Sequence, residues 1–324
     1  MHRFPQVACA LLLCAPVALA SDFDMAVLSG GGFSVTVLPG ETVDYQVVGR
    51  LTDNLNEGLA AFRFDLEFDG GGLPQADAPT SGIMLNFTNP LGWSNPAGFG
   101  GTLKDGKLLQ IGGAQNTINN SFPVDPSGGI ITGVAWPGSV ETLVTGSFQA
   151  PFIPGNYTLS IANPEANVIR QGETGNPFWA CDYAPLGLTV NLDVTVISVL
   201  DVDVPSISIA TGGTQNFSLD AGVANAGRTY FLAGTTSGTS PGTSVGGITV
   251  PLNSPDPYLD FIIANPNQPP LFMAVATLDS QGKASASFML PPGTPYVGFE
   301  LDHAYVLLAP IDFASNSVHL SLLP

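Results

Sequence analysis

The sequence predicts an all-β protein built from two consecutive antiparallel β-sandwich domains. Apolar and polar residues alternate with a period of two in many short runs, which is typical of half-buried strands. The 38 glycines and 28 prolines of the 324 residues supply turns between these runs. No window of twelve or more residues shows helical periodicity with capping residues. Many short strands separated by turns favour a sandwich.

Residues 1–20 have the three parts of a secretory signal peptide. Arg3 supplies positive charge near the start, an apolar run extends from Val7 to Ala20, and the small residues Ala18 and Ala20 predict cleavage before Ser21. The run is shorter than the roughly 20 apolar residues that span a bilayer, and no second run follows. We therefore expect a protein without membrane insertion that is secreted, extracellular or at the cell surface, or periplasmic.

The predicted first domain covers residues 21–199. In its clearest strand, 62–69, Phe62, Phe64, Leu66 and Phe68 occupy one face and four charged residues occupy the other. Further strands are expected at 33–38, 42–51, 108–111, 143–150, 157–162 and 186–199. These strands are enough for one β-sandwich.

A linker is predicted at 200–205, where Asp201, Asp203 and Pro205 suit an exposed junction. The second domain, 206–324, should be a further sandwich, immunoglobulin-like or similar. Its strands are expected at 207–211, 216–221, 229–233, 259–264, 301–308 and 318–322, with a hairpin that joins 273–278 to 283–290 through the turn 279–282.

Several phrases of the first domain carry a resemblance to a known family. They are Leu38-Pro39-Gly40-Glu41-Thr42-Val43, the run 58–69, Leu143-Val144-Thr145-Gly146-Ser147-Phe148 and Pro154-Gly155-Asn156-Tyr157-Thr158-Leu159. Over residues 25–198 the chain resembles cohesin-like domains, which are jelly-roll sandwiches related to some carbohydrate-binding modules. The resemblance implies a fold; its residues lie in core strands and turns, so no binding residue is carried over.

The second domain resembles a β-rich module found at the C-termini of secreted bacterial proteins. The resemblance rests on the run 212–215, the run 234–242, His303-Ala304-Tyr305 and Ala314-Ser315-Asn316. No activity comes with this likeness.

Charge limits the classes of partner. Eight Lys and Arg face 26 Asp and Glu, a net charge of −18. Such a surface repels nucleic acid and anionic lipid headgroups. Cys181 is the only cysteine outside the signal peptide, so it is expected either as a buried thiol or in an intermolecular disulfide.

Serine hydrolysis is one enzymatic hypothesis for this sequence. Ser240 and Ser244 each match G-x-S-x-G, but a strand follows where a nucleophile elbow needs a helix. Asp302 and His303 are neighbours on a strand and should point to opposite faces, which argues against a triad with His303 or His319. The sequence therefore predicts no catalytic residue and no enzyme.

Two acidic segments are candidates, one for a pair of glycosidase carboxylates and one for a calcium site. Asp65, Glu67 and Asp69 share a strand face at about 7 Å per pair, a spacing that suits glycosidase carboxylates, but alternation alone predicts a solvated outer face. The turn 53–58, from Asp53 to Gly58, offers oxygen ligands, so a loop calcium site is an alternative to an ordinary turn. No cofactor is expected otherwise.

Aromatic residues of the first domain are the candidate ligand-binding residues. Trp93 and Trp136 lie in loop-like segments and Phe99 is close to Trp93, so the three could stack on a sugar ring; the alternative is loop residues folded over the sandwich ends. The leading expectation is a secreted, non-catalytic binding or structural protein that acts in adhesion, matrix organisation or protein docking. The alternative is a carbohydrate-binding protein. The partner is an extracellular protein or polysaccharide, and the oligomeric state is open.

Overall fold

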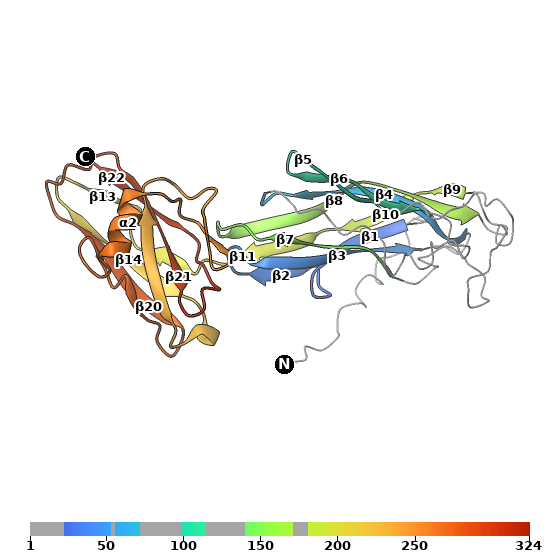
Figure 1. Cartoon of the computed structure of the whole chain (residues 1–324). Helices are drawn as coiled ribbons and strands as arrows, with labels where there is room; N and C mark the ends of the chain where they lie inside the picture. The colour runs from blue at the N-terminus through green and yellow to red at the C-terminus, as the bar shows by residue number, and fades with distance from the viewer. Residues whose placement is uncertain (1–22, 53–55, 72–98, 115–139, 171–180) are drawn as a thin grey trace. The chain divides into compact units, whose positions relative to one another are not determined.

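The computed structural model describes residues 23–52, 56–71, 99–114, 140–170 and 181–324. The chain forms two compact units. Unit 1 comprises Met1–Thr36, Thr42–Gln149 and Asn156–Thr195, and unit 2 comprises Val37–Glu41, Ala150–Gly155 and Val196–Pro324. Almost all regular structure in both is β-strand, as predicted (Figure 1). No helix in the described residues is long and apolar enough to cross a membrane. The domain limits 21–199 and 206–324 stay a prediction.

Unit 1 is a sandwich of two sheets. One has the order β10-β1-β3-β7, and the other has the order β2-β11-β8-β4-β6-β5, with β9 paired to β8. The strands are β1 Phe23–Leu28, β2 Ser34–Val37, β3 Thr42–Leu51, β4 Asn56–Phe68, β5 Phe99–Lys104, β6 Lys107–Ala114, β7 Glu141–Gln149, β8 Gly155–Arg170, β9 Cys181–Ala184, β10 Leu186–Val190 and β11 Leu192–Val196. The alternation in β4 is confirmed, because Phe62, Phe64, Leu66 and Phe68 are all buried.

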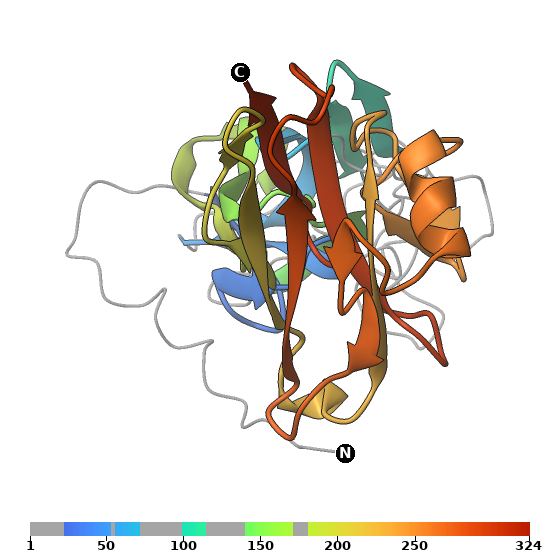
Figure 2. The ribbon, with the colours of Figure 1, turned by 90° about the vertical axis from the view of Figure 1, so that its left-hand side faces the viewer.

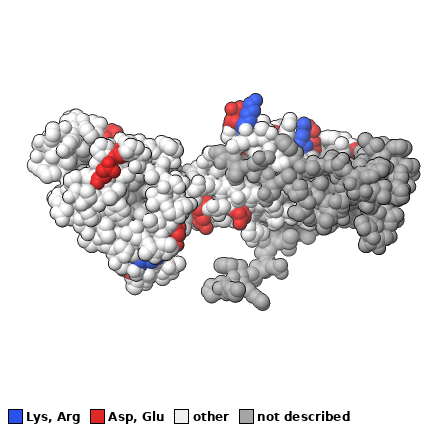
Figure 3. Space-filling model, in the orientation of Figure 1, with Lys and Arg blue, Asp and Glu red and all other residues white. Residues whose placement is uncertain are grey.

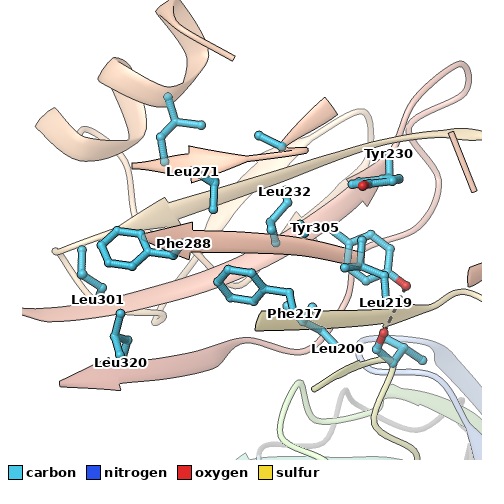
Figure 4. Packing of buried hydrophobic residues seen from close by; sticks show 14 of the residues in the cluster. Leu200, Phe217, Leu219, Tyr230, Leu232, Leu271, Phe288, Leu301, Tyr305 and Leu320 are labelled. Carbon is cyan, nitrogen blue, oxygen red and sulfur yellow. Dashed lines mark hydrogen bonds between the residues drawn. The ribbon is translucent and has the colours of Figure 1, made fainter. Parts of the chain in front are cut away.

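Unit 2 is a second sandwich (Figure 2). Its sheets have the orders β12-β14-β20-β18 and β13-β22-β21-β15-β19, and β16 and β17 form a small hairpin. The strands are β12 Leu200–Val202, β13 Ser206–Ser208, β14 Gly213–Asp220, β15 Thr229–Thr235, β16 Thr243–Val245, β17 Ile248–Val250, β18 Leu271–Phe272, β19 Val275–Thr277, β20 Lys283–Leu290, β21 Glu300–Leu307 and β22 Val318–Leu323. Its core is shown in Figure 4, where Phe217, Phe288 and Tyr305 lie between the sheets.

The sandwiches are not wholly antiparallel. β1 pairs parallel with β10, and β13 pairs parallel with β22. In each unit a strand from the beginning of the unit therefore lies beside one from its end. A parallel pair needs a long connection, and the intervening strands of the unit supply it.

Three segments differ from the sequence prediction. The predicted strand 259–264 is wrong, because this segment lies in a helix, α2 Pro257–Ala264. The predicted hairpin is also wrong: the turn at Asp279 forms, but β19 pairs with β15 while β20 pairs with β14 and β18, so the turn joins two sheets. The predicted strand 186–199 is divided into β10 and β11.

The segment predicted as a linker, 200–205, begins in the core of unit 2. Leu200 is fully buried, and β12 pairs with β14. The buried side chain of Asn316 holds this segment: its Oδ1 accepts from the amides of Val199 and Leu200 at 2.9 and 3.1 Å, and its Nδ2 donates to the Leu200 carbonyl at 2.8 Å. One amide side chain thus bonds three backbone groups of this segment; the Ser198 hydroxyl also donates to the Leu200 carbonyl, at 3.1 Å.

We expect Asn316→Ala to destabilise unit 2 by about 3 kcal/mol, because the buried amides of Val199 and Leu200 lose the oxygen that accepts from them, while the Leu200 carbonyl keeps only the Ser198 hydroxyl. Asn265→Ala is a matched control, since the exposed Asn265 side chain makes one bond to the Phe261 carbonyl. Urea unfolding of the full chain, followed by hydrogen exchange of residues 199–220, measures both. Equal losses in the two variants would contradict this role of Asn316.

Candidate functional site: an aromatic groove of unit 2

The groove of unit 2 has α2 as one wall, and a buried carboxylate positions this helix. Asp256 is fully buried and caps α2, where its Oδ1 accepts from the amides of Tyr258 and Leu259, both at 2.9 Å. Pro257 follows at the first helical position, where its fixed φ suits the helix and its missing N–H costs nothing. An aspartate followed by proline is a helix-start signal, so this helix could have been found in the sequence.

The second oxygen of Asp256 ties the helix to the end of β15. Its Oδ2 accepts from the Thr236 amide at 2.9 Å and from the hydroxyls of Thr236 and Ser237, both at 2.7 Å. Burial alone would raise the pKa of Asp256, but the hydrogen bonds from Leu259, Thr236 and Ser237 together hold this pKa well below its usual range. The carboxylate is therefore charged and fully hydrogen-bonded inside the protein.

Tyr258 connects α2 with the core. Its hydroxyl lies 3.1 Å from Nε2 of His303, which is fully buried among the rings of Tyr258, Phe217 and Phe288. Burial lowers the pKa of His303 to about 3, with a smaller contribution from His319, so the imidazole is neutral at pH 7. Burial likewise raises the pKa of Tyr258, and nearby Asp256 adds to this shift.

Gly234 leaves space for this histidine–tyrosine pair. A Cβ at this position would come within 2.5 Å of Tyr258 Cε1 and 2.7 Å of His303 Cδ2. Such approaches are well inside van der Waals contact, so any side chain at position 234 would displace the pair and with it the start of α2. A glycine is required here for space.

The groove opens between α2 and the segment 291–299 and has a volume of about 720 Å³. Its lining includes six aromatic side chains: Tyr258, Phe261, Phe272, Phe288, Tyr296 and Phe299. Four prolines add rigid apolar surface: Pro257, Pro269, Pro270 and Pro291. The other lining residues are Thr236, Met289, Leu290, Thr294, Leu301 and Leu322. None of these residues is charged.

The floor and the walls of the groove differ in exposure. On the floor, Phe288, Leu290 and Leu301 are buried; Phe288 and Leu301 lie close together at one end of the core (Figure 4). On the walls, Phe261, Met289, Tyr296 and Phe299 are 43–48% exposed. Contiguous exposed apolar side chains of this kind mark binding sites on soluble proteins. Much of the surface of unit 2 that faces the viewer in Figure 3 is neither acidic nor basic.

Of the three candidate sugar-binding residues, the structure describes only Phe99. Trp93 and Trp136 lie outside the described residues, and Phe99 is the first residue of β5, opposite Gly112 of β6. Cys181 begins β9, where it pairs with Ile169. Neither Phe99 nor Cys181 lines the groove. The groove was missed in the sequence because its residues come from segments of unit 2 that lie far apart in the chain, from Thr236 to Leu322.

The serine and histidine candidates do not form a triad. His303 contacts Tyr258, and His319 contacts Asp302 at 2.9 Å and Glu300 at 2.7 Å; neither contacts Ser240 or Ser244. Asp302 and His303 do point to opposite faces of β21, as predicted. The hydrogen bond to Asp302, with that to Glu300, raises the pKa of His319. Because two carboxylates hold this imidazole, it favours the protonated form and is poorly suited to act as a base.

The strand acids have structural partners. Asp65 accepts from the Gln110 amide at 2.7 Å and from Asn163 Nδ2 at 2.8 Å, and Glu67 pairs with Lys107 at 2.7 Å. Gln110 and Asn163 both have positive φ, so Asp65 supports irregular backbone on the two strands beside β4. Asp69 accepts from the Thr158 amide at 2.7 Å. These carboxylates join neighbouring strands, as an outer sheet face allows.

The calcium alternative concerns residues 53–58, of which 53–55 lie outside the described residues. Among the residues that the structure describes, no group of three or more His, Cys, Asp or Glu could hold a metal ion. The calcium site at Asp53 to Gly58 therefore stays a prediction.

The chain is similar to solved cohesin structures. A scan of protein-family models and a search of curated proteins each find no match. The sixth cohesin of Acetivibrio cellulolyticus scaffoldin B, in complex with a Cel5 dockerin mutant, is 17% identical, with 55% of this chain and 100% of that chain covered and a TM-score of 0.34. A non-cellulosomal cohesin from Archaeoglobus fulgidus is 11% identical, with 55% and 93% covered and a TM-score of 0.30.

A type II cohesin dyad from the adaptor scaffoldin ScaA of A. cellulolyticus is 10% identical, with 89% of this chain and 88% of that chain covered and a TM-score of 0.34. The β-sandwich expected for residues 25–198 is present in the two sheets of unit 1. Nothing about function follows from similarity at this level.

We expect Asp256→Asn to destabilise α2 by about 2 kcal/mol at pH 7, because an amide cannot accept on both sides as the carboxylate does. The folded pKa of Asp256 lies below the unfolded value of about 3.9, so its contribution is complete above that pH and is lost as the pH falls toward the folded pKa. The difference between wild type and variant should therefore shrink below about pH 4.

Hydrogen exchange of the α2 amides between pH 7 and pH 3 measures this difference. Asp260→Asn, an exposed change in the same helix, is the control and should change little. A constant difference across this pH range would show that the Asp256 charge does not stabilise α2.

Proposed function

We propose that this is a non-catalytic binding protein that docks another polypeptide through the aromatic groove of unit 2. One observation supports the proposal: an uncharged groove of about 720 Å³ has four half-exposed apolar side chains on its walls, in a chain with a net charge of −18. Aromatic side chains such as Phe261, Tyr296 and Phe299 are the usual anchors of protein interfaces. The signal peptide predicted at 1–20 supports a role outside the cell.

Two hydroxyl groups of the groove are already hydrogen-bonded within unit 2, and a third, that of Thr294, is buried, which favours a polypeptide over a sugar as the ligand. The hydroxyl of Thr236 donates to Asp256, and the hydroxyl of Tyr258 pairs with His303. Sugars need several polar groups that converge on their hydroxyls, whereas apolar side chains need only a complementary surface. The docking role therefore fits the groove better than carbohydrate binding does.

Panning a phage-displayed random peptide library on the full chain tests this proposal. We expect enriched peptides whose affinity falls about tenfold or more in Phe261→Asp and in Phe299→Asp, because each change places a charge at an apolar anchor. Val223→Asp is the matched control, since Val223 is 68% exposed and does not line the groove. Failure to enrich any peptide, or equal binding by all variants, would count against docking at this groove.

A second proposal is carbohydrate binding by unit 1 through Trp93, Phe99 and Trp136, which the loop-like sequence around the tryptophans favours. We expect the full chain to be retained on at least one glycan of a polysaccharide array, with about tenfold weaker retention for Trp93→Ala and Trp136→Ala. Phe261→Asp is the control and should leave glycan retention unchanged. No retention by the unmodified chain would remove this proposal for the glycans tested.

A further inference from the structure

The proposed docking role does not specify the chemistry of the partner. The residues that line the groove and the charges next to it indicate which ligands fit. Its centre selects apolar groups, because no charged side chain lines it and two of its hydroxyls are already hydrogen-bonded within unit 2. A charged group placed in the groove would lose water without meeting an opposite charge. The part of the ligand that enters the groove must therefore be apolar, aromatic or proline-containing.

The charges next to the groove are acidic. Asp260 is exposed on α2 between lining residues Tyr258 and Phe261, and Glu300 directly follows lining residue Phe299. His319 and Ser321 hydrogen-bond to Glu300, whereas no hydrogen bond or ion pair of the Asp260 side chain is seen among the described residues. A ligand that extends beyond the groove near α2 thus meets the carboxylate of Asp260.

Protonated His319 offsets Glu300, but no Lys or Arg of unit 2 offsets Asp260. Arg228 pairs with Asp312 at 2.5 Å, and Lys283 pairs with Asp220 at 2.8 Å. Neither basic residue lines the groove. The electrostatic field at the α2 side of the groove is therefore negative, and a ligand with a cationic end is attracted to it.

The same charge disfavours a second copy of this chain as the occupant. Two copies would each bring a net charge of −18 to the contact, and acidic residues flank the groove on both. An anionic lipid surface is disfavoured for the same reason. The remaining candidate is a different polypeptide with positive charge.

Building on the proposed docking role, we propose that the groove binds an extended polypeptide segment with an apolar, proline- or aromatic-containing centre flanked by Lys or Arg. The apolar centre contacts Phe261, Met289, Tyr296 and Phe299, and a flanking cation lies near Asp260. Aromatic and proline side chains suit such a groove because they bury large rigid surfaces at low entropic cost.

The proposal can be tested with three synthetic peptides. All three share a centre of Pro, Phe and Leu, and they are flanked by Lys, by Ser or by Glu. Fluorescence anisotropy with the full chain should show binding of the Lys-flanked peptide at least tenfold tighter than that of the Glu-flanked one at low salt. The ratio should decrease as salt is added, because exposed charges are screened. Phe261→Asp should weaken the Lys-flanked and Ser-flanked peptides alike.

Asp260→Asn should reduce the preference for Lys over Glu about threefold. Asp201→Asn is the control, since Asp201 lies on β12, the edge strand opposite β18 in its sheet, and should leave the preference unchanged. Equal affinity for the three peptides would overturn the charge selection while docking of apolar segments stands. If library peptides bind the groove but none of the three does, the proposed ligand class is wrong and docking survives.

Sedimentation of the full chain tests whether a second copy of the chain occupies the groove. We expect a concentration-independent monomer, or an oligomer that Phe261→Asp leaves intact. A dimer that Phe261→Asp dissociates would overturn the proposal, because the groove would then be occupied by a second copy.

Discussion

Five hydrogen bonds to one buried carboxylate connect the parts of unit 2 on which the groove depends. Asp256 caps α2 with one oxygen and holds the end of β15 with the other. The wall of the groove is thereby fixed to the sheet that carries Gly234, whose missing side chain lets Tyr258 and His303 meet. A buried charge is tolerated only when its hydrogen bonds are satisfied, so this arrangement demands a single geometry of helix, strand end and loop.

The sequence predicts those strands whose two faces differ in environment. β4 has one buried and one exposed face, and its alternation of Phe62, Phe64, Leu66 and Phe68 with charged residues locates it well. β1 was missed, because all six of its residues are buried and no alternation remains to be seen. A strand that is covered on both faces lacks the period-two alternation that identifies a half-buried strand.

The groove depends on a helix cap and on the order of strands in the sheets, and neither follows from composition or periodicity. The segment 259–264 is apolar and short, and such a run fits a strand or a helix equally until its cap is considered. Asp256 followed by Pro257 decides for the helix. Which residues then meet around the helix is set by sheet order, since β20, β21 and β22 each contribute one end to the floor. Non-local pairing of this kind cannot be obtained from one sequence by pattern alone.

The acidic composition and the apolar groove are connected through self-association. An exposed cluster such as Phe261, Met289, Tyr296 and Phe299 would ordinarily favour contact between copies. A net charge of −18 opposes that contact at long range, whereas it attracts a cationic partner to the same surface. Acidic charge next to an uncharged groove thus distinguishes self-association from binding of the proposed partner. A second copy and a cationic partner could both make the apolar contact, but only the cationic partner approaches without repulsion. The acidic composition, which disfavours nucleic acid and anionic lipid as partners, therefore also contributes to the selectivity of the proposed site.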